Sequence, residues 1–237
     1  MKLVAVAGGV TLTLLTSLSA HAADMTPVVQ PAPSSYIPAK FLWSGFYLGG
    51  ALGYAWGSAT FTDPFAAATG SPSLKGFLVG GLIGVNYQFD TWVVGFEGDF
   101  TGTWANGSVV DAAGNNLQTR VFWTSTLTGR IGVALDRLLI YGKGGAAFAY
   151  DRDTVTVAPS RVGADGSTYR AGWTFGGGLE YAITEHWIAR VEYDYLKFSS
   201  TNFVFTDGRP VLLGGITGGG NVSFTLNEAK AAMAYKF

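Results

Sequence analysis

The feature that most constrains this chain is the alternation of apolar and polar residues in segments of about ten residues. The segment WIARVEYDYLKF is one example, and successive side chains of an extended strand point to opposite sides. One face would carry Trp187, Ala189, Val191, Tyr193 and Tyr195, and the other Ile188, Arg190, Glu192, Asp194 and Leu196. In water the apolar face would be buried. In a membrane barrel the apolar face meets lipid and the polar face points inward.

Eight segments of this kind occur along the chain. They cover roughly residues 45–56, 76–89, 92–104, 121–134, 138–150, 169–183, 187–198 and 227–237. The chain is rich in Gly and aromatic residues, with 34 Gly, 16 Phe, 11 Tyr and 7 Trp, and only 13% of its residues are charged. It has no second long apolar run after the N-terminus, which excludes helical spans in the remaining chain. Because every backbone group must be paired in lipid, we predict an all-β fold, an eight-stranded antiparallel transmembrane up-and-down β-barrel.

The N-terminal residues predict export. Lys2 precedes a short uncharged stretch and the small residues around Ala22, which is typical of a secretory signal peptide covering residues 1–22. Residues 23–40 contain four prolines and predict a periplasmic linker, and residues 41–237 form the predicted barrel. Without the signal peptide the chain has 14 basic and 16 acidic residues, which does not favour nucleic-acid binding. It has no Cys, so disulfides and thiolate metal sites are excluded.

The lengths of the connections alternate strictly. Short turns around residues 90–91, 135–137 and 183–186 separate long connections at 58–75, 105–120, 151–168 and 199–226. Outer-membrane barrels have short periplasmic turns and long external loops, so both ends of the barrel should lie on the periplasmic side. Tryptophans near the predicted strand ends suggest an aromatic girdle at the lipid boundary. They are Trp43, Trp56, Trp92, Trp104, Trp123 and Trp187.

The alternation places many charged side chains inside the predicted barrel. They are Glu97, Asp99, Arg130, Lys143, Glu180, Arg190, Glu192, Asp194 and Lys230. An eight-stranded ring is only wide enough for its own inward side chains. A mixture of both charge signs favours a structural network of ion pairs over a selectivity ring, although an ion path is an alternative.

The sequence offers little material for catalysis. His21 belongs to the predicted signal peptide, and His186 lies in a short turn on the periplasmic rim, away from any predicted Ser or Thr nucleophile. Glu192 and Asp194 share a strand face, but ion pairing with nearby arginines is their expected use. The chain contains no zinc ligand set, phosphate loop or dinucleotide fingerprint. We therefore predict no catalytic residue, metal site or cofactor.

Several segments resemble one family. FLWSGFYLGGALGYAWG, VGGLIGVNYQFDTWVVGFEGDF, GRIGVALDRLLIYGKGGAAFA and the terminal AYKF are similar to alphaproteobacterial outer-membrane β-barrel proteins of the porin-family or opacity type, which include surface antigens. The resemblance spans nearly the whole chain after residue 40. It implies an OmpA-type eight-stranded barrel in the outer membrane of a Gram-negative bacterium.

The resemblance also suggests a role and partners. It implies a structural surface protein that contributes to envelope integrity and displays external loops, and the alternatives are a small passive pore or an adhesin. The expected partners are outer-membrane lipids and lipopolysaccharide, the outer-membrane insertion machinery, and a host or surface ligand bound through the loops. The terminal residues Tyr235 and Phe237 resemble the signal that this machinery recognises.

Overall fold

The computed structural model describes residues 40–62, 69–110, 114, 116–157, 162–202 and 221–237. Eight long strands form the barrel: β1 (Gly45–Thr62), β3 (Ser73–Phe89), β4 (Trp92–Thr103), β6 (Asn116–Leu135), β7 (Leu138–Val157), β8 (Val162–Ala182), β9 (Trp187–Asn202) and β10 (Asn221–Lys236). Two short strands, β2 (Thr69–Gly70) and β5 (Asn106–Val110), accompany them. The predicted signal peptide and almost all of the predicted linker lie outside the described residues.

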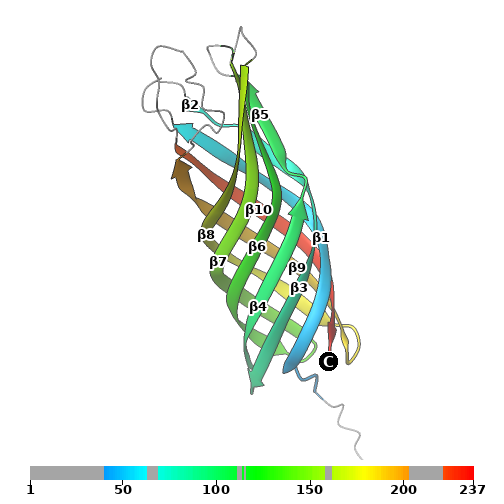
Figure 1. Cartoon of the computed structure of the whole chain (residues 1–237). Coiled ribbons are helices and arrows are strands. Elements are labelled where there is room, and N and C mark those ends of the chain that lie inside the picture. The colour runs from blue at the N-terminus through cyan, green and yellow to red at the C-terminus, as the bar shows by residue number, and fades with distance from the viewer. Residues whose placement is uncertain (1–39, 63–68, 111–113, 115, 158–161, 203–220) are drawn as a thin grey trace, which may run out of the picture. The chain divides into compact units, whose positions relative to one another are not determined.

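The eight long strands close into a ring in which every neighbouring pair is antiparallel (Figure 1). β1 pairs with β3 on one side and with β10 on the other, so the first and last strands form the closing seam. β5 continues β4 and pairs with β6, and β2 pairs with the far end of β1. The ring has no open edge, which satisfies the backbone within lipid. The predicted eight-stranded barrel is confirmed.

At one end of the barrel, two-residue turns join β3 to β4 and β6 to β7, and a four-residue turn joins β8 to β9. Asp90 and Asp136 both adopt the left-handed conformation, with φ of 54°. Aspartate tolerates this conformation because its short side chain can bond to the nearby backbone, which suits tight hairpins. The C-terminus lies at the same end (Figure 1), where the amide of Phe237 donates a hydrogen bond to the carbonyl of Phe46, with N···O 2.9 Å. The barrel therefore begins and ends at the side of the short turns.

At the opposite end the strands are longer than predicted. The segments 58–75, 105–120, 151–168 and 199–226 were expected to be loops, but β-structure enters all four from their flanking strands. β7 and β8 remain paired up to Val157 and Val162, well past the predicted end of β7 at residue 150. The loop prediction was wrong here because Thr, Asp and Gly also occur in strands that continue into water, where they need no apolar outer face.

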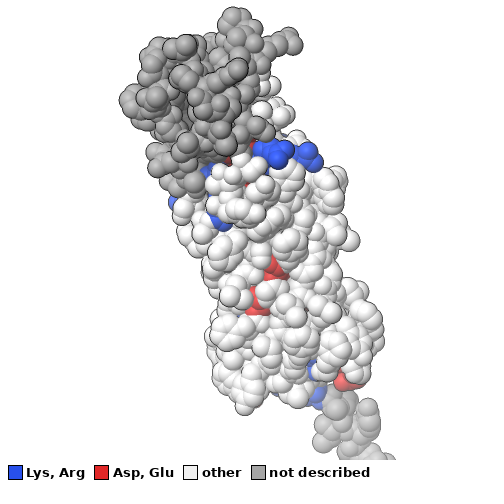
Figure 2. All heavy atoms as spheres, in the orientation of Figure 1, with Lys and Arg blue, Asp and Glu red and all other residues white. Residues whose placement is uncertain are grey.

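The two faces of the strands follow the predicted alternation. On β9, Val191 is 56% exposed on the outer wall, while Asp194 on the inner face is fully buried. Large apolar side chains are exposed along the outer wall, and Figure 2 shows that few charged residues lie on most of one described face. Within the described part of the chain, no helix is long and apolar enough to cross a membrane.

One predicted member of the aromatic girdle lies elsewhere. Trp56, Trp92, Trp104 and Trp187 have exposed rings on the outer wall, whereas Trp43 is 1% exposed. The indole of Trp43 donates a hydrogen bond to the carbonyl of Asp136, with N···O 3.0 Å, and its ring packs edge-on against Phe41, 4.9 Å between centroids. Trp43 precedes β1, so strand alternation does not apply to it. It closes the short-turn end of the barrel instead.

We expect a cation on the outer wall to be costly in proportion to its depth. Val191 lies midway between the boundary aromatics Trp187 and Tyr195 of β9, so Val191→Arg should lower the free energy of unfolding by roughly 2–4 kcal/mol. Ser199→Arg, eight residues further along the same strand and on the same face, should cost about 0–1 kcal/mol because it lies beyond the hydrocarbon. Urea unfolding in lipid vesicles measures both changes. Equal losses would contradict the placement of β9 in the membrane.

Candidate functional site

The interior of the barrel consists of three stacked layers of inward side chains. We call the first, at the short-turn end, the periplasmic apolar layer: Phe41, Trp43, Tyr47, Leu82, Val93, Ala134, Leu139, Tyr141, Ala182, Ile188 and Ala234. The charged layer follows it. The outer apolar layer comes last: Ala55, Ala59, Leu74, Leu78, Ala105, Val121, Ala147, Ala149, Leu196, Phe198, Phe224 and Leu226. The charged layer is thus enclosed between two apolar layers, which the alternation of polar and apolar residues did not reveal.

The nine inward charges named from the sequence all lie in the charged layer, together with Glu228. They are Glu97, Asp99, Arg130, Lys143, Glu180, Arg190, Glu192, Asp194, Glu228 and Lys230, and each is at most 7% exposed. They come from β4, β6, β7, β8, β9 and β10, so almost the whole ring contributes. Residues far apart in the sequence therefore meet in one buried cluster.

Two arginines hold one side of the charged layer. Arg190 Nη1 lies 2.6 Å from Glu97 Oε2, and its Nη2 lies 2.6 Å from Glu180 Oε1. Arg130 contacts the same two carboxylates, at 3.1 Å from Glu97 Oε2 and 2.6 Å from Glu180 Oε1. The guanidinium of Arg130 also lies over the ring of Tyr141, 3.9 Å from its centroid. Two planar cations thus share two carboxylates, a geometry that suits the fork of the guanidinium group.

Two lysines hold the other side. Lys143 Nζ lies within 3.5 Å of four carboxylates, those of Glu97, Asp99, Glu192 and Asp194. Lys230 Nζ lies 2.6 Å from Asp194 Oδ2 and 3.0 Å from Glu192 Oε1. Each carboxylate in this group therefore faces at least one ammonium. Buried charges require such pairing because their desolvation is costly.

Neutral donors complete the charged layer, and most of them were missed from the sequence. The Tyr47 hydroxyl donates to Glu97 Oε2, with O···O 2.7 Å, and the Tyr141 hydroxyl donates to Glu192. Thr124 donates to Glu228 Oε1, with O···O 3.0 Å. These residues lie on the same inward face of their strands as the named charges, so the alternation could have identified them. The two tyrosines were overlooked because they carry no charge, whereas Thr124 shares the predicted inward face of Arg130.

Glycines allow the charged layer to pack closely. A Cβ atom at Gly176 would collide with Oδ1 of Asp194, and one at Gly84 would collide with the Tyr47 hydroxyl. Both glycines face the interior on strands that neighbour these polar groups. The close approach of backbone to side chain leaves no room for a larger residue at either position.

A smaller polar cluster lies beyond the outer apolar layer. Arg170 Nε donates to Asp151 Oδ1, with N···O 2.9 Å, and its Nη2 donates to Asp153 Oδ2, with N···O 3.1 Å. Thr119 donates to Asp153 Oδ1, with O···O 2.5 Å. Asp151 and Asp153 were missed because 151–168 was interpreted as a loop, and Thr119 because 105–120 was. Alternation that continues along β6, β7 and β8 places all four side chains inside.

Among the described residues, one group of carboxylates is close enough together to hold a metal ion. It lies in the charged layer and consists of Glu97, Asp99 and Glu192. Lys143 Nζ lies at 3.2, 3.2 and 2.8 Å from these three side chains. An ammonium thus already occupies the position that a cation would take, so the group does not fit a metal site. His186 lies in the turn between β8 and β9, as predicted, and its ring stacks on that of Tyr235, 5.3 Å between centroids.

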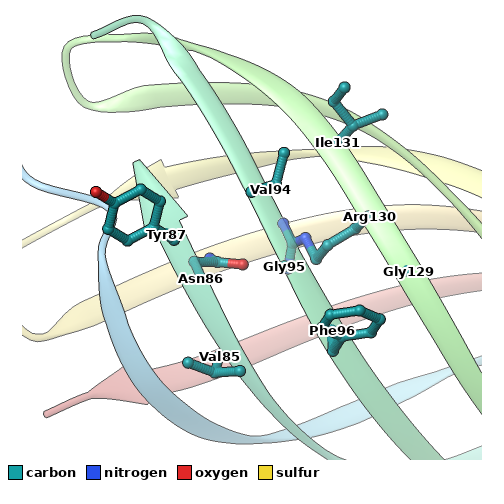
Figure 3. Close-up of a pocket in the computed structure, with 9 residues that line it drawn as sticks. All are labelled: Val85, Asn86, Tyr87, Val94, Gly95, Phe96, Gly129, Arg130 and Ile131. Atoms are coloured by element: carbon teal, nitrogen blue, oxygen red, sulfur yellow. The ribbon is translucent and has the colours of Figure 1, made fainter. Parts of the chain in front are cut away.

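The outer wall has a shallow depression near the short-turn end, formed by β3, β4 and β6 (Figure 3). Val85, Tyr87, Phe96 and Ile131 border it with exposed side chains. Gly129 is exposed on the same face, and its lack of a side chain leaves space between them. The lining is almost entirely apolar and belongs to the membrane-facing wall, where hydrocarbon chains are the natural contact.

The terminal residues Tyr235 and Phe237 lie at the closing seam. Their rings are 5.1 Å apart, and Phe237 also packs against Phe46 of β1 at 5.7 Å. Tyr235 contacts Trp187 of β9 at 5.3 Å. The end of the chain thus joins β10 to both of its neighbours through aromatic contacts as well as the strand ladder.

Comparisons with known proteins identify the family of the chain. Residues 10–237 match the family model described as outer membrane protein beta-barrel domain. The chain is 34% identical to the 31 kDa outer-membrane immunogenic protein of Brucella melitensis, over 80% of this chain and 85% of that protein. It is 32% identical to the 25 kDa outer-membrane immunogenic protein of Brucella canis, over 79% of this chain and 80% of that protein. Among solved structures, OprG of Pseudomonas aeruginosa has 16% identity and a TM-score of 0.45, covering 82% of this chain and 96% of that chain. The chain therefore belongs to the outer membrane protein beta-barrel domain family, as a β-barrel surface protein of the Gram-negative outer membrane.

Proposed function

We propose that the protein is a non-conducting structural barrel, which contributes to the integrity of the envelope and displays its external loops. The observation that carries this proposal is the filled interior. Two apolar layers enclose a charged layer in which every cation is paired with carboxylates. An ion would have to cross both apolar layers without water, at a high cost in desolvation. A filled interior suits a rigid anchor better than a pore.

The passive pore is the main rival, and conductance distinguishes the two. We expect the purified barrel in planar bilayers to give no stable conductance steps, because the outer layer is closed by Phe198 and Phe224, whose rings stack at 4.5 Å. The sample must contain folded barrel. A difference in gel migration between unheated and heated protein verifies this, because only the closed barrel migrates differently when it is not heated. Regular conductance steps that depend on this folded form would overturn the structural role in favour of the pore.

The contribution to the envelope is tested in cells. A strain lacking the protein should admit an apolar dye faster and resist detergent less well than its parent, and the complete gene should restore both properties. Unchanged permeability and resistance would contradict the structural role. The Brucella relatives are named immunogenic proteins, which supports exposure of the loops to a host. Adhesion through these loops is the second candidate, and binding to host surfaces by loop-deleted variants tests it.

A further inference from the structure

Two basic residues on the outer wall, Arg120 and Arg152, lie apart from the ion pairs inside the barrel. Arg120 of β6 and Arg152 of β7 face each other directly across the two strands, and both are exposed. Like charges in directly opposed positions destabilise an antiparallel pair. Among the residues whose side chains are described, neither guanidinium has a carboxylate within ion-pair distance. An anion bound between the two groups would relieve this repulsion.

The local structure directs both guanidinium groups to the same place. The register between β6 and β7 shifts between Val121 and Trp123, which inserts Phe122 as an extra residue. The guanidinium carbon of Arg120 lies 5.1 Å from the centroid of the Phe122 ring, and that of Arg152 lies 5.8 Å from it. Arg152 Nε also donates to Ser167 Oγ, with N···O 3.3 Å. Both guanidinium groups therefore lie against the same aromatic ring on the outer surface of the barrel.

A third basic residue extends the site along the same register. Lys75 of β3 pairs with Asn106 of β5, and Asn106 pairs with Arg120. Lys75 is therefore two strands from Arg120, about 10 Å at the usual strand spacing. Lys75, Asn106 and Arg120 are all exposed on the outer wall. The row offers three cations and one neutral amide to a ligand outside the barrel, and Figure 2 shows basic residues gathered near this end of one face.

The position relative to the membrane identifies the kind of ligand. Trp123, Tyr150 and Tyr169 form an aromatic belt across β6, β7 and β8, with centroids 6.3 Å apart for the first two and 4.8 Å for the last two. Arg152 is the next outward residue beyond Tyr150, about 7 Å further along the strand in the direction away from the membrane core. Aromatic belts mark the headgroup level of a bilayer. The two arginines therefore lie just where the charged groups of outer-leaflet lipids begin.

We propose that Arg120 and Arg152, with Lys75 beside them, bind the phosphate groups of lipopolysaccharide in the outer leaflet. Guanidinium groups bind phosphate with paired hydrogen bonds, and a phosphate between the two arginines removes their mutual repulsion. The apolar wall below the belt accommodates the acyl chains of the same molecule. A soluble polyanion would gain only the first of these contacts. This site deepens the proposed structural role, because it attaches the barrel to the lipid that surrounds it.

Binding of lipid A to the purified, folded barrel in detergent tests the site. Wild type should bind bis-phosphorylated lipid A at least about tenfold more tightly than chemically dephosphorylated lipid A, as charge-assisted hydrogen bonds require. Arg120→Gln with Arg152→Gln should lose this preference. Arg120→Lys with Arg152→Lys should keep part of it, since the charges remain. The shift on unheated gels verifies that each variant is folded.

A matched control separates the site from general electrostatics. Lys40→Gln with Lys197→Gln removes the same charge from two exposed lysines elsewhere on the barrel, and should keep the preference for phosphorylated lipid A. Equal loss in both double variants, or an undiminished preference in the arginine variant, would overturn the site. Binding of inorganic phosphate alone as tightly as lipid A would also overturn it. These measurements use purified protein, so their failure is distinct from a failure of the permeability test in cells.

Discussion

A chain that lacks Ala234–Phe237 will not reach the cell surface. These residues supply three register pairs to β1, namely Tyr47 with Lys236, Leu48 with Tyr235 and Gly49 with Ala234. Their removal opens the seam at the short-turn end and exposes backbone groups of β1 and β9 to lipid, at several kcal/mol for each unpaired group. We expect surface labelling of intact cells to fall to background and the chain to be degraded in the periplasm.

A matched variant separates closure of the ring from recognition of the C-terminus. Replacing Tyr235, Lys236 and Phe237 by Ala keeps the backbone ladder and removes only the side chains. If closure dominates, this variant folds in detergent and shows the shift on unheated gels, whereas the truncated chain does not. If the terminal aromatic residues act as an insertion signal, the alanine variant folds in detergent yet reaches the surface poorly. Normal surface labelling of the truncated chain would refute the closure argument.

Lys143→Met will destabilise the barrel strongly. Methionine fills nearly the same space, but the four carboxylates around Lys143 Nζ lose their shared cation. Removing one partner from a buried ion-pair group typically costs about 3–5 kcal/mol. We expect a loss of this size in the free energy of unfolding, measured with urea in lipid vesicles.

Two further variants show whether the loss arises from uncompensated charge. Arg137→Met removes a cation from an ion pair with Glu185 at the rim, where the two side chains are 37% and 70% exposed. It should cost less than about 1 kcal/mol, since exposed pairs contribute little. Without Lys143 the carboxylates of the charged layer outnumber its cations further, so adding Glu192→Gln to Lys143→Met removes one excess negative charge and should recover part of the stability. A similar cost for Lys143→Met and Arg137→Met would show that the charged layer contributes no more than a surface pair.

Much of this fold could be predicted from the sequence because strand alternation is a local property. A residue such as Val191 or Glu192 faces lipid or the interior according to its position along the strand, and this needs no knowledge of the partner strands. The short turns at Asp90 and Asp136 are also encoded locally, since they depend on which residues tolerate the left-handed conformation. The eight strands, the outward aromatic wall and the inward position of the nine named charges follow from these two kinds of signal.

Other properties depend on contacts between distant strands, and only the tertiary structure decided them. The depth of a strand residue in the barrel is set by the stagger between strands, which alternation does not reveal. The sequence therefore did not show that Leu196 and Phe198 belong to an apolar layer. Glu192 and Asp194, on the same strand, belong to the charged layer next to it. Trp43 precedes the first strand, and its burial depends on the turn around Asp136, 93 residues away. The pairing of Arg120 with Arg152 depends on the register between β6 and β7 and on the bulge at Phe122. Register and closure arise from the whole ring, because each strand is positioned by both of its neighbours.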